Sequence, residues 1–119
     1  MKRLTFKPEF VDAILDGTKT ATFRFKYPYL AAGDIVAATT RTGKTPAHLV
    51  KACDGFCQLR IVSVTARNWR DFTADDYTKT HGTPEFYEAQ NQRDGWGWFI
   101  EFERVPPRKF YTVLFGANE

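Results

Sequence analysis

Apolar and polar positions along the chain follow two different periods, and each period predicts one kind of element. Between Phe10 and Leu15 the apolar residues fall in pairs that are one helical turn apart. This spacing predicts a helix over residues 8–16 with one apolar face. Pro8 suits the first helical turn, and Gly17 suits the left-handed residue that ends a helix. The residues expected to pack on a sheet are Phe10, Val11, Ile14 and Leu15.

Residues 20–25 alternate strictly, which is the period of a strand with one buried face. Ala21, Phe23 and Phe25 are predicted to face a core. The other face is polar and cationic, and its members are Thr20, Thr22 and Arg24.

The remaining pattern is dominated by strands. Further strands are predicted at Leu4–Phe6, 35–39, 56–65, 96–104 and 109–115, with short helices at 74–80 and 84–90 and a polar, Gly- and Pro-containing loop at 41–55. No internal repeat or linker divides residues 1–119. We therefore predict a single α+β domain whose curved sheet closes into a small β-barrel, with a few short helices at its sides.

Composition supports one ordered domain and gives few cofactor signals. Aromatic residues make up 16% of the 119 residues, which supplies enough large side chains for a core without a cofactor. We expect no membrane span and no signal peptide, and therefore a cytoplasmic protein. Two cysteines, Cys53 and Cys57, and two histidines, His48 and His81, lack the usual spacing of a zinc site. We predict no bound metal.

Charge is distributed unevenly along the chain. Residues 1–70 carry 12 Lys and Arg against 5 Asp and Glu, whereas residues 71–119 carry 5 against 9. A basic surface attracts polyanions, but solvated lysines alone do not establish nucleic-acid binding. The sequence carries no signal for an oligomeric state.

One segment concentrates the candidate chemistry. Lys19 follows the glycine that ends the first helix, and Arg24 ends the polar face of the next strand. Together with the hydroxyls of Thr20 and Thr22 they offer one point charge, one bidentate donor and two hydrogen-bonding groups. The pattern predicts an anion or nucleotide site in one shared cleft.

The run Gly17-Thr18-Lys19-Thr20-Ala21-Thr22-Phe23-Arg24 has the form GxKxxxxR, which resembles the signature of the ASCH domain, a branch of the PUA-like superfamily. The Gly33-Asp34 turn and the order of predicted elements resemble the same family across almost the whole chain. The resemblance implies a β-barrel with a cleft that binds RNA or a modified nucleoside.

Some small members of that family are amidohydrolases that deacylate N4-acetylcytidine with a Lys, a Thr and a Glu. The resemblance places the Lys on Lys19 and the Thr on Thr22. Where the Glu is expected, this chain has Asp75 and Asp76, and Asp76 is the candidate replacement. Other members are ribonucleases or binding modules, so the fold alone does not decide the activity.

Three functions therefore remain open at this point. The first is an RNA- or nucleoside-binding domain, in which Lys19 pairs with phosphate and an aromatic ring stacks on the base. The rings available for stacking are Tyr27, Tyr29, Trp69 and Trp96, of which Tyr27 and Trp69 are the preferred candidates. The second is a small hydrolase, and the third is a domain that binds a protein partner.

Overall fold

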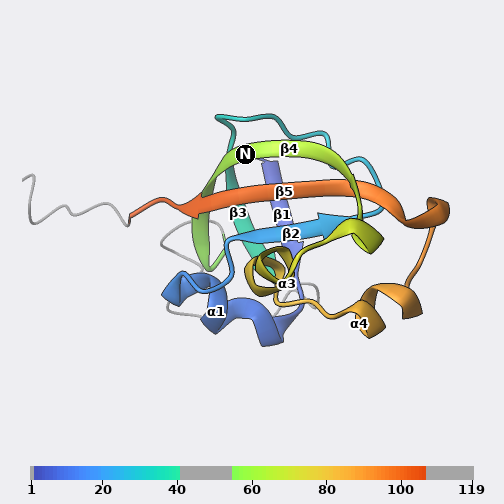
Figure 1. Cartoon of the computed structure of the whole chain (residues 1–119). Coiled ribbons are helices and arrows are strands. Elements are labelled where there is room, and N and C mark those ends of the chain that lie inside the picture. Colours follow the sequence, from blue (N-terminus) through green and yellow to red (C-terminus); the bar gives the residue numbers. More distant parts are fainter. Residues whose placement is uncertain (1, 41–54, 107–119) are drawn as a thin grey trace, which may run out of the picture.

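The computed structural model describes residues 2–40 and 55–106, and its centre is a five-stranded mixed sheet (Figure 1). The strands are β1 (Lys2–Phe6), β2 (Ala21–Arg24), β3 (Ile35–Thr40), β4 (Cys57–Asn68) and β5 (Trp96–Arg104). Their spatial order is β1-β3-β4-β5-β2. The β1–β3 pair is parallel, and the other neighbouring pairs are antiparallel.

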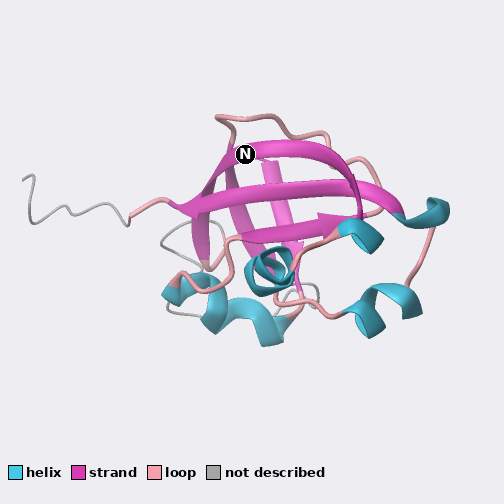
Figure 2. Ribbon diagram, viewed as in Figure 1, coloured by secondary structure: helices cyan, strands magenta, loops and turns pink. Residues whose placement is uncertain are grey.

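Short helices connect the strands and gather beside β2 (Figure 2). They are η1 (Pro8–Phe10), α1 (Val11–Asp16), η2 (Trp69–Asp71), α3 (Ala74–Thr80), α4 (Pro84–Ala89) and η3 (Arg93–Gly95). The helix predicted at 8–16 is present as one 3₁₀ turn that continues into α1. Gly17 ends it with φ 84°, the left-handed conformation that its position predicted.

The sheet is open rather than closed in the part of the chain that the structure describes. β1 and β2 are both edge strands, so the predicted closed barrel is not seen there. The predicted curvature is present: β4 and β5 are long and bent, and their register shifts between Ile61 and Ser63 (Figure 1). The strand predicted at 109–115 and the loop predicted at 41–55, apart from residue 55, lie outside the described residues.

Two hydrophobic clusters hold the helices to the sheet. The first joins β1, β3, β4 and β5 to α1, where Ile14 is fully buried and Phe10 and Leu15 pack at the margin. The second is aromatic and lies where β2 and β5 meet α3 and α4. In it Phe72 contacts Phe23 and Phe99 edge-on, with ring centroids 5.1 and 5.3 Å apart.

The alternation in β2 determines where the site forms. Ala21 and Phe23 are buried in the aromatic cluster, with Phe25 packed against it, as the sequence predicted. Successive strand residues point to opposite faces, so Thr22 and Arg24 are directed away from that cluster.

Candidate functional site

A pocket of about 340 Å³ lies where the two edge strands, β1 and β2, face each other. β1 contributes Phe6, β2 contributes Thr22, Phe23 and Arg24, and short helices together with the loops between elements supply the rest of the lining. The remaining lining residues are Lys7, Phe10, Lys19, Phe25, Lys26, Thr80, Gly82, Phe86, Tyr87, Gln90 and Gln92. The space left by the open sheet is thus the pocket itself.

Arg24 spans this gap between the edge strands. Its Nη2 donates a hydrogen bond of 2.5 Å to the backbone carbonyl of Thr5 in β1. Its guanidinium also lies 5.4 Å from the centroid of the Phe6 ring. The side chain therefore ties β2 to β1 and carries a positive charge into the pocket.

A tight turn after α1 delivers Lys19 to the same place. The carboxylate of Asp16 accepts hydrogen bonds from the backbone N–H and the hydroxyl of Thr18, at 2.9 and 2.7 Å. The N–H of Lys19 donates to the carbonyl of Ala13, and the N–H of Thr20 donates to that of Lys79 in α3. With its backbone fixed on both sides, the chain directs the Lys19 side chain inward.

Lys19 is a buried amine, with 3% of its surface exposed. Burial, and secondarily the charge of Arg24, lowers the pKa of Lys19 from 10.5 to about 7. Its Nζ lies 4.7 Å from the centroid of the Phe10 ring, and no carboxylate among the described residues pairs with it. The amine is therefore poised between its charged and neutral forms near neutral pH.

The hydrogen bonds of Lys19 give each of these forms a distinct role. Its Nζ donates to the backbone carbonyls of Ala21, at 2.8 Å, and of Thr80, at 2.5 Å. A neutral amine has two N–H bonds, and these two acceptors occupy both, which leaves the nitrogen lone pair for a third partner. A protonated amine has a third N–H in that position. The same nitrogen can accept a proton or hold an anion.

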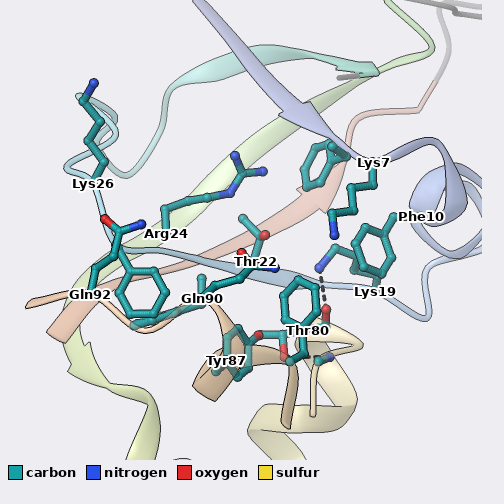
Figure 3. A pocket seen from close by; sticks show the side chains of 15 residues that line it. Lys7, Phe10, Lys19, Thr22, Arg24, Lys26, Thr80, Tyr87, Gln90 and Gln92 are labelled. Atoms are coloured by element: carbon teal, nitrogen blue, oxygen red, sulfur yellow. Dashed lines mark hydrogen bonds between the residues drawn. The ribbon is translucent and has the colours of Figure 1, made fainter. Parts of the chain in front are cut away.

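The polar groups of the pocket converge on Thr22. Figure 3 shows the side chains of Lys7, Lys19 and Arg24 directed toward the space beside Thr22, with Lys26 at the edge and extending away. Thr22 is buried, and its side chain lines the pocket. Among the described residues, the lining contains four cationic side chains and no Asp or Glu. The pocket therefore has the electrostatic character of an anion-binding site.

Asp76, the candidate for the missing carboxylate, is not brought to the pocket. Its carboxylate accepts a hydrogen bond of 2.7 Å from Arg67 and one of 2.9 Å from the N–H of Thr73. With the return bond from Asp76 N–H to the Thr73 hydroxyl, this forms a capping box at the start of α3. Burial alone would raise the pKa of Asp76, but these bonds outweigh it and lower the pKa. The position of Asp76 fits a structural role.

We expect Asp76→Ala to lower the free energy of unfolding by about 1–2 kcal/mol, because α3 loses its cap and Arg67 loses its partner. Asp75→Ala is the matched control: Asp75 is exposed, its contact with Lys79 is a surface ion pair, and its loss should change stability by less than about 0.5 kcal/mol. Urea denaturation measures both. A folded Asp76→Ala protein that has lost ligand binding or turnover would instead place Asp76 in the site.

The other predicted site residues lie around the pocket rather than in it. Thr20 is half-buried and uses its backbone to join α3 and β5. Trp69 is buried in the aromatic cluster, where its Nε1–H donates to the side chain of Asn91 at 2.9 Å, so it offers no free face for stacking. Tyr27 is 43% exposed and follows the pocket residue Lys26 along the chain.

Sequence reasoning missed the residues that come from distant elements. Lys7 follows β1, and its amine lies 4.7 Å from the centroid of the Phe86 ring in α4. Tyr87 is buried against Gly82, where an added Cβ would come within 2.4 Å of the Tyr87 hydroxyl. Thr80 contributes a carbonyl, which no side-chain motif reveals. Of these three residues, only Lys7 could have been proposed from the sequence, because it is a basic residue directly after the first predicted strand.

Within the described ranges, no group of three His, Cys, Asp or Glu side chains is placed to hold a metal ion. Of the residues considered for zinc, Cys57 is buried and His81 is exposed, while His48 and Cys53 lie outside the described residues. No helix in the same ranges has the length and apolar content that a membrane-spanning helix needs.

Comparison with known proteins identifies the fold. No protein-family model and no curated protein matches the sequence. The structure is similar to a serine-to-alanine variant of an ASCH protein from Zymomonas mobilis, with a TM-score of 0.65 and 15% identity over 93% of this chain and 75% of that one. It is also similar to an ASCH domain from Lactobacillus crispatus JV V101, with a TM-score of 0.56 and 18% identity over 78% and 68%.

A protein from Enterococcus faecalis V583 gives a TM-score of 0.63 with 11% identity over 92% of this chain and 84% of that one. These identities are low, so the likeness concerns the fold. The chain has the fold of these ASCH-domain structures, which confirms the family resemblance predicted from GxKxxxxR.

Proposed function

We propose that this protein binds RNA in the cytoplasm and that the pocket between β1 and β2 accepts one nucleoside of the strand. The observation that carries the proposal is the described lining, in which Lys7, Lys19 and Arg24 are directed into the space, Lys26 stands at its edge, and several Phe rings but no carboxylate complete the wall. The ASCH-domain fold supports the same ligand class through the family resemblance.

The size and chemistry of the pocket suit a single nucleoside. About 340 Å³ is at the lower end of the range for small-molecule sites, too small for a duplex. Phe rings offer apolar surface to a base, and Gln90 and Gln92 at the pocket border offer amide groups that donate and accept hydrogen bonds. Arg24 and the protonated form of Lys19 would contact the adjoining phosphate.

Removal of the Arg24 charge tests this binding site. We expect Arg24→Met to weaken the affinity for cytidine 5′-monophosphate about 10-fold, since it deletes a charge-assisted contact. It should also reduce the slope of log affinity against log salt for the hexanucleotide rC6 by about one. Isothermal titration calorimetry at several salt concentrations measures both.

Arg60→Met is the matched control, because it deletes the same charge from the surface of β4, where Arg60 pairs with Glu103. It should leave the affinity for the monophosphate unchanged. Equal losses in the two variants would indicate diffuse attraction by the basic half of the chain and would contradict a defined site.

A second function, amide hydrolysis, is favoured by one specific observation. Lys19 is buried, its pKa is lowered to about 7, and its two N–H bonds in the neutral form are held by backbone carbonyls. A lysine can act as a general base only when a neutral amine is available near the working pH. A lysine that only pairs with phosphate gains nothing from a lowered pKa. Thr22 lines the same pocket and carries a hydroxyl.

The reaction on N4-acetylcytidine would then proceed in two steps. The Lys19 amine takes the Thr22 hydroxyl proton while the oxygen attacks the acetyl carbonyl carbon. The C–N bond breaks, cytidine leaves with the proton returned by Lys19, and the acetyl group remains as a threonine ester. Water, deprotonated by the same amine, then attacks the ester carbonyl carbon. The bond from that carbon to the Thr22 oxygen breaks, Lys19 returns the proton to this oxygen, and acetic acid leaves and ionises to acetate. Arg24 would stabilise the negative charge on the carbonyl oxygen.

A further inference from the structure

Three aromatic side chains form a cluster on the surface next to the pocket. Tyr27 contacts Tyr29 and Trp98 edge-on, with ring centroids 4.7 and 4.9 Å apart. Tyr29 is 73% exposed and Tyr27 is 43% exposed. We refer to Tyr27, Tyr29 and Trp98 as the aromatic platform. Exposed rings in mutual contact are unusual, since rings usually bury their faces in a core.

The platform adjoins the pocket both along the chain, in the loop after β2, and across the sheet, through β5. Along the chain, Lys26 lines the pocket and Tyr27 is the next residue. Across the sheet, Trp98 of β5 is directly opposite Arg24 of β2 in the antiparallel register. Directly opposite residues project from the same face with their Cβ atoms about 5 Å apart. The platform therefore begins where the cationic side of the pocket ends.

The backbone of Tyr29 is held in an unfavourable conformation that keeps its ring in this position. Its φ is 55°, in the left-handed region, which is costly for a residue with a bulky side chain. The amine of Lys2 donates to the Tyr29 carbonyl at 3.0 Å and to the Asp34 carboxylate at 3.1 Å, which ties this turn to β1. Backbone strain that the surrounding structure maintains is concentrated at functional sites.

We propose that the aromatic platform stacks the base of the nucleotide adjoining the one in the pocket, so that the ligand is single-stranded RNA rather than a free nucleoside. This inference rests on the proposed function of the pocket. Each base has a π-face, so exposed rings accept any unpaired base, and a duplex would hide those faces. Lys26, between the pocket and the platform, would contact the phosphate that links the two nucleotides.

The test replaces Tyr29 with glycine. Glycine adopts a φ of 55° without strain, so Tyr29→Gly removes the ring while the melting temperature stays close to that of the wild type. We expect its affinity for the hexanucleotides rC6, rU6 and rA6 to fall about 10-fold or more, and its affinity for cytidine 5′-monophosphate to stay within about 2-fold. Tyr29→Phe keeps both the ring and the backbone and should bind the hexanucleotides like the wild type.

The outcomes separate the platform from the pocket. Unchanged hexanucleotide affinity in a folded Tyr29→Gly protein overturns the platform and leaves the pocket as proposed. Equal losses for monophosphate and hexanucleotide overturn it as well, because the ring would then act through the pocket. Wild-type protein that binds neither probe contradicts both proposals. A dimer in sedimentation that Tyr29→Gly dissociates would assign the rings to an interface between two copies instead.

Discussion

The wild-type protein is expected to gain about 2 kcal/mol of unfolding free energy between about pH 7 and pH 9 because of Lys19. In the folded chain this amine loses its proton around pH 7, whereas in the unfolded chain it keeps the proton until about 10.5. Between these values the unfolded state binds more protons, so stability rises with pH by up to about 1.4 kcal/mol per unit. Below about pH 7 the burial penalty of the charged amine is fully present, and it is relieved as the pH rises.

Lys19→Met isolates this contribution, because it removes the titrating group and keeps an apolar chain of similar length. The difference in unfolding free energy between wild type and variant, measured by urea denaturation at several pH values, should change by about 2 kcal/mol across that range. The pH range for the wild type is limited to about pH 9 by two tyrosines. Burial raises the pKa of Tyr77 and Tyr87 in the folded chain, so their ionisation at higher pH favours the unfolded state. A difference that does not vary with pH would mean that Lys19 titrates normally.

The sequence predicted the parts of the fold that depend on local pattern. The strand at 96–104 and the helix at 74–80 have the predicted bounds. The start of that helix is held by a hydrogen-bonded cap between Thr73 and Asp76, which requires only neighbouring residues. The alternation over residues 20–25 placed one face of β2 in the core for the same reason.

The open sheet and the pocket in it depend on contacts between distant segments. β1 pairs with β3 rather than with β2, and this arrangement creates the gap that Arg24 spans. The local pattern assigned Lys7 to no element, and it gave Thr80 no role in the site because the group that contacts Lys19 is a backbone carbonyl. Trp69 was a candidate for stacking because an aromatic ring is suited both to base stacking and to core packing. Its burial follows from α4 packing against η2.

The degree of burial of Lys19 was also hidden in the sequence. A lysine after a helix-ending glycine is usually solvated, because a charged amine is rarely buried without a partner. Here two backbone carbonyls and the Phe10 ring replace water. The acceptors come from β2 and α3, which meet only in the folded chain. The signature GxKxxxxR therefore specifies that a lysine is present, whereas the burial that lowers the pKa of Lys19 depends on the tertiary structure.

Thr22→Val separates the two functions considered for the pocket, and its expected effect is the largest of all. Valine has the shape of threonine without the hydroxyl, so the buried position remains filled. If the protein hydrolyses N4-acetylcytidine, the variant should lose turnover by on the order of 10³-fold or more, because the attacking oxygen is gone. Its affinity for cytidine 5′-monophosphate should change by no more than about 10-fold, the upper end of the effect of one neutral hydrogen bond.

The pH profile of the wild type provides the second half of the test. A lysine base must be neutral, so turnover should rise with pH through about 7, while the affinity for a phosphate should fall over the same range as Lys19 loses its charge. Opposite slopes for turnover and affinity would show that one amine controls both. Wild-type protein without turnover, whose affinity for cytidine 5′-monophosphate falls as the pH rises through 7, would contradict hydrolysis. Binding would then be the function of the site, in keeping with a described lining that lacks a carboxylate to orient the base.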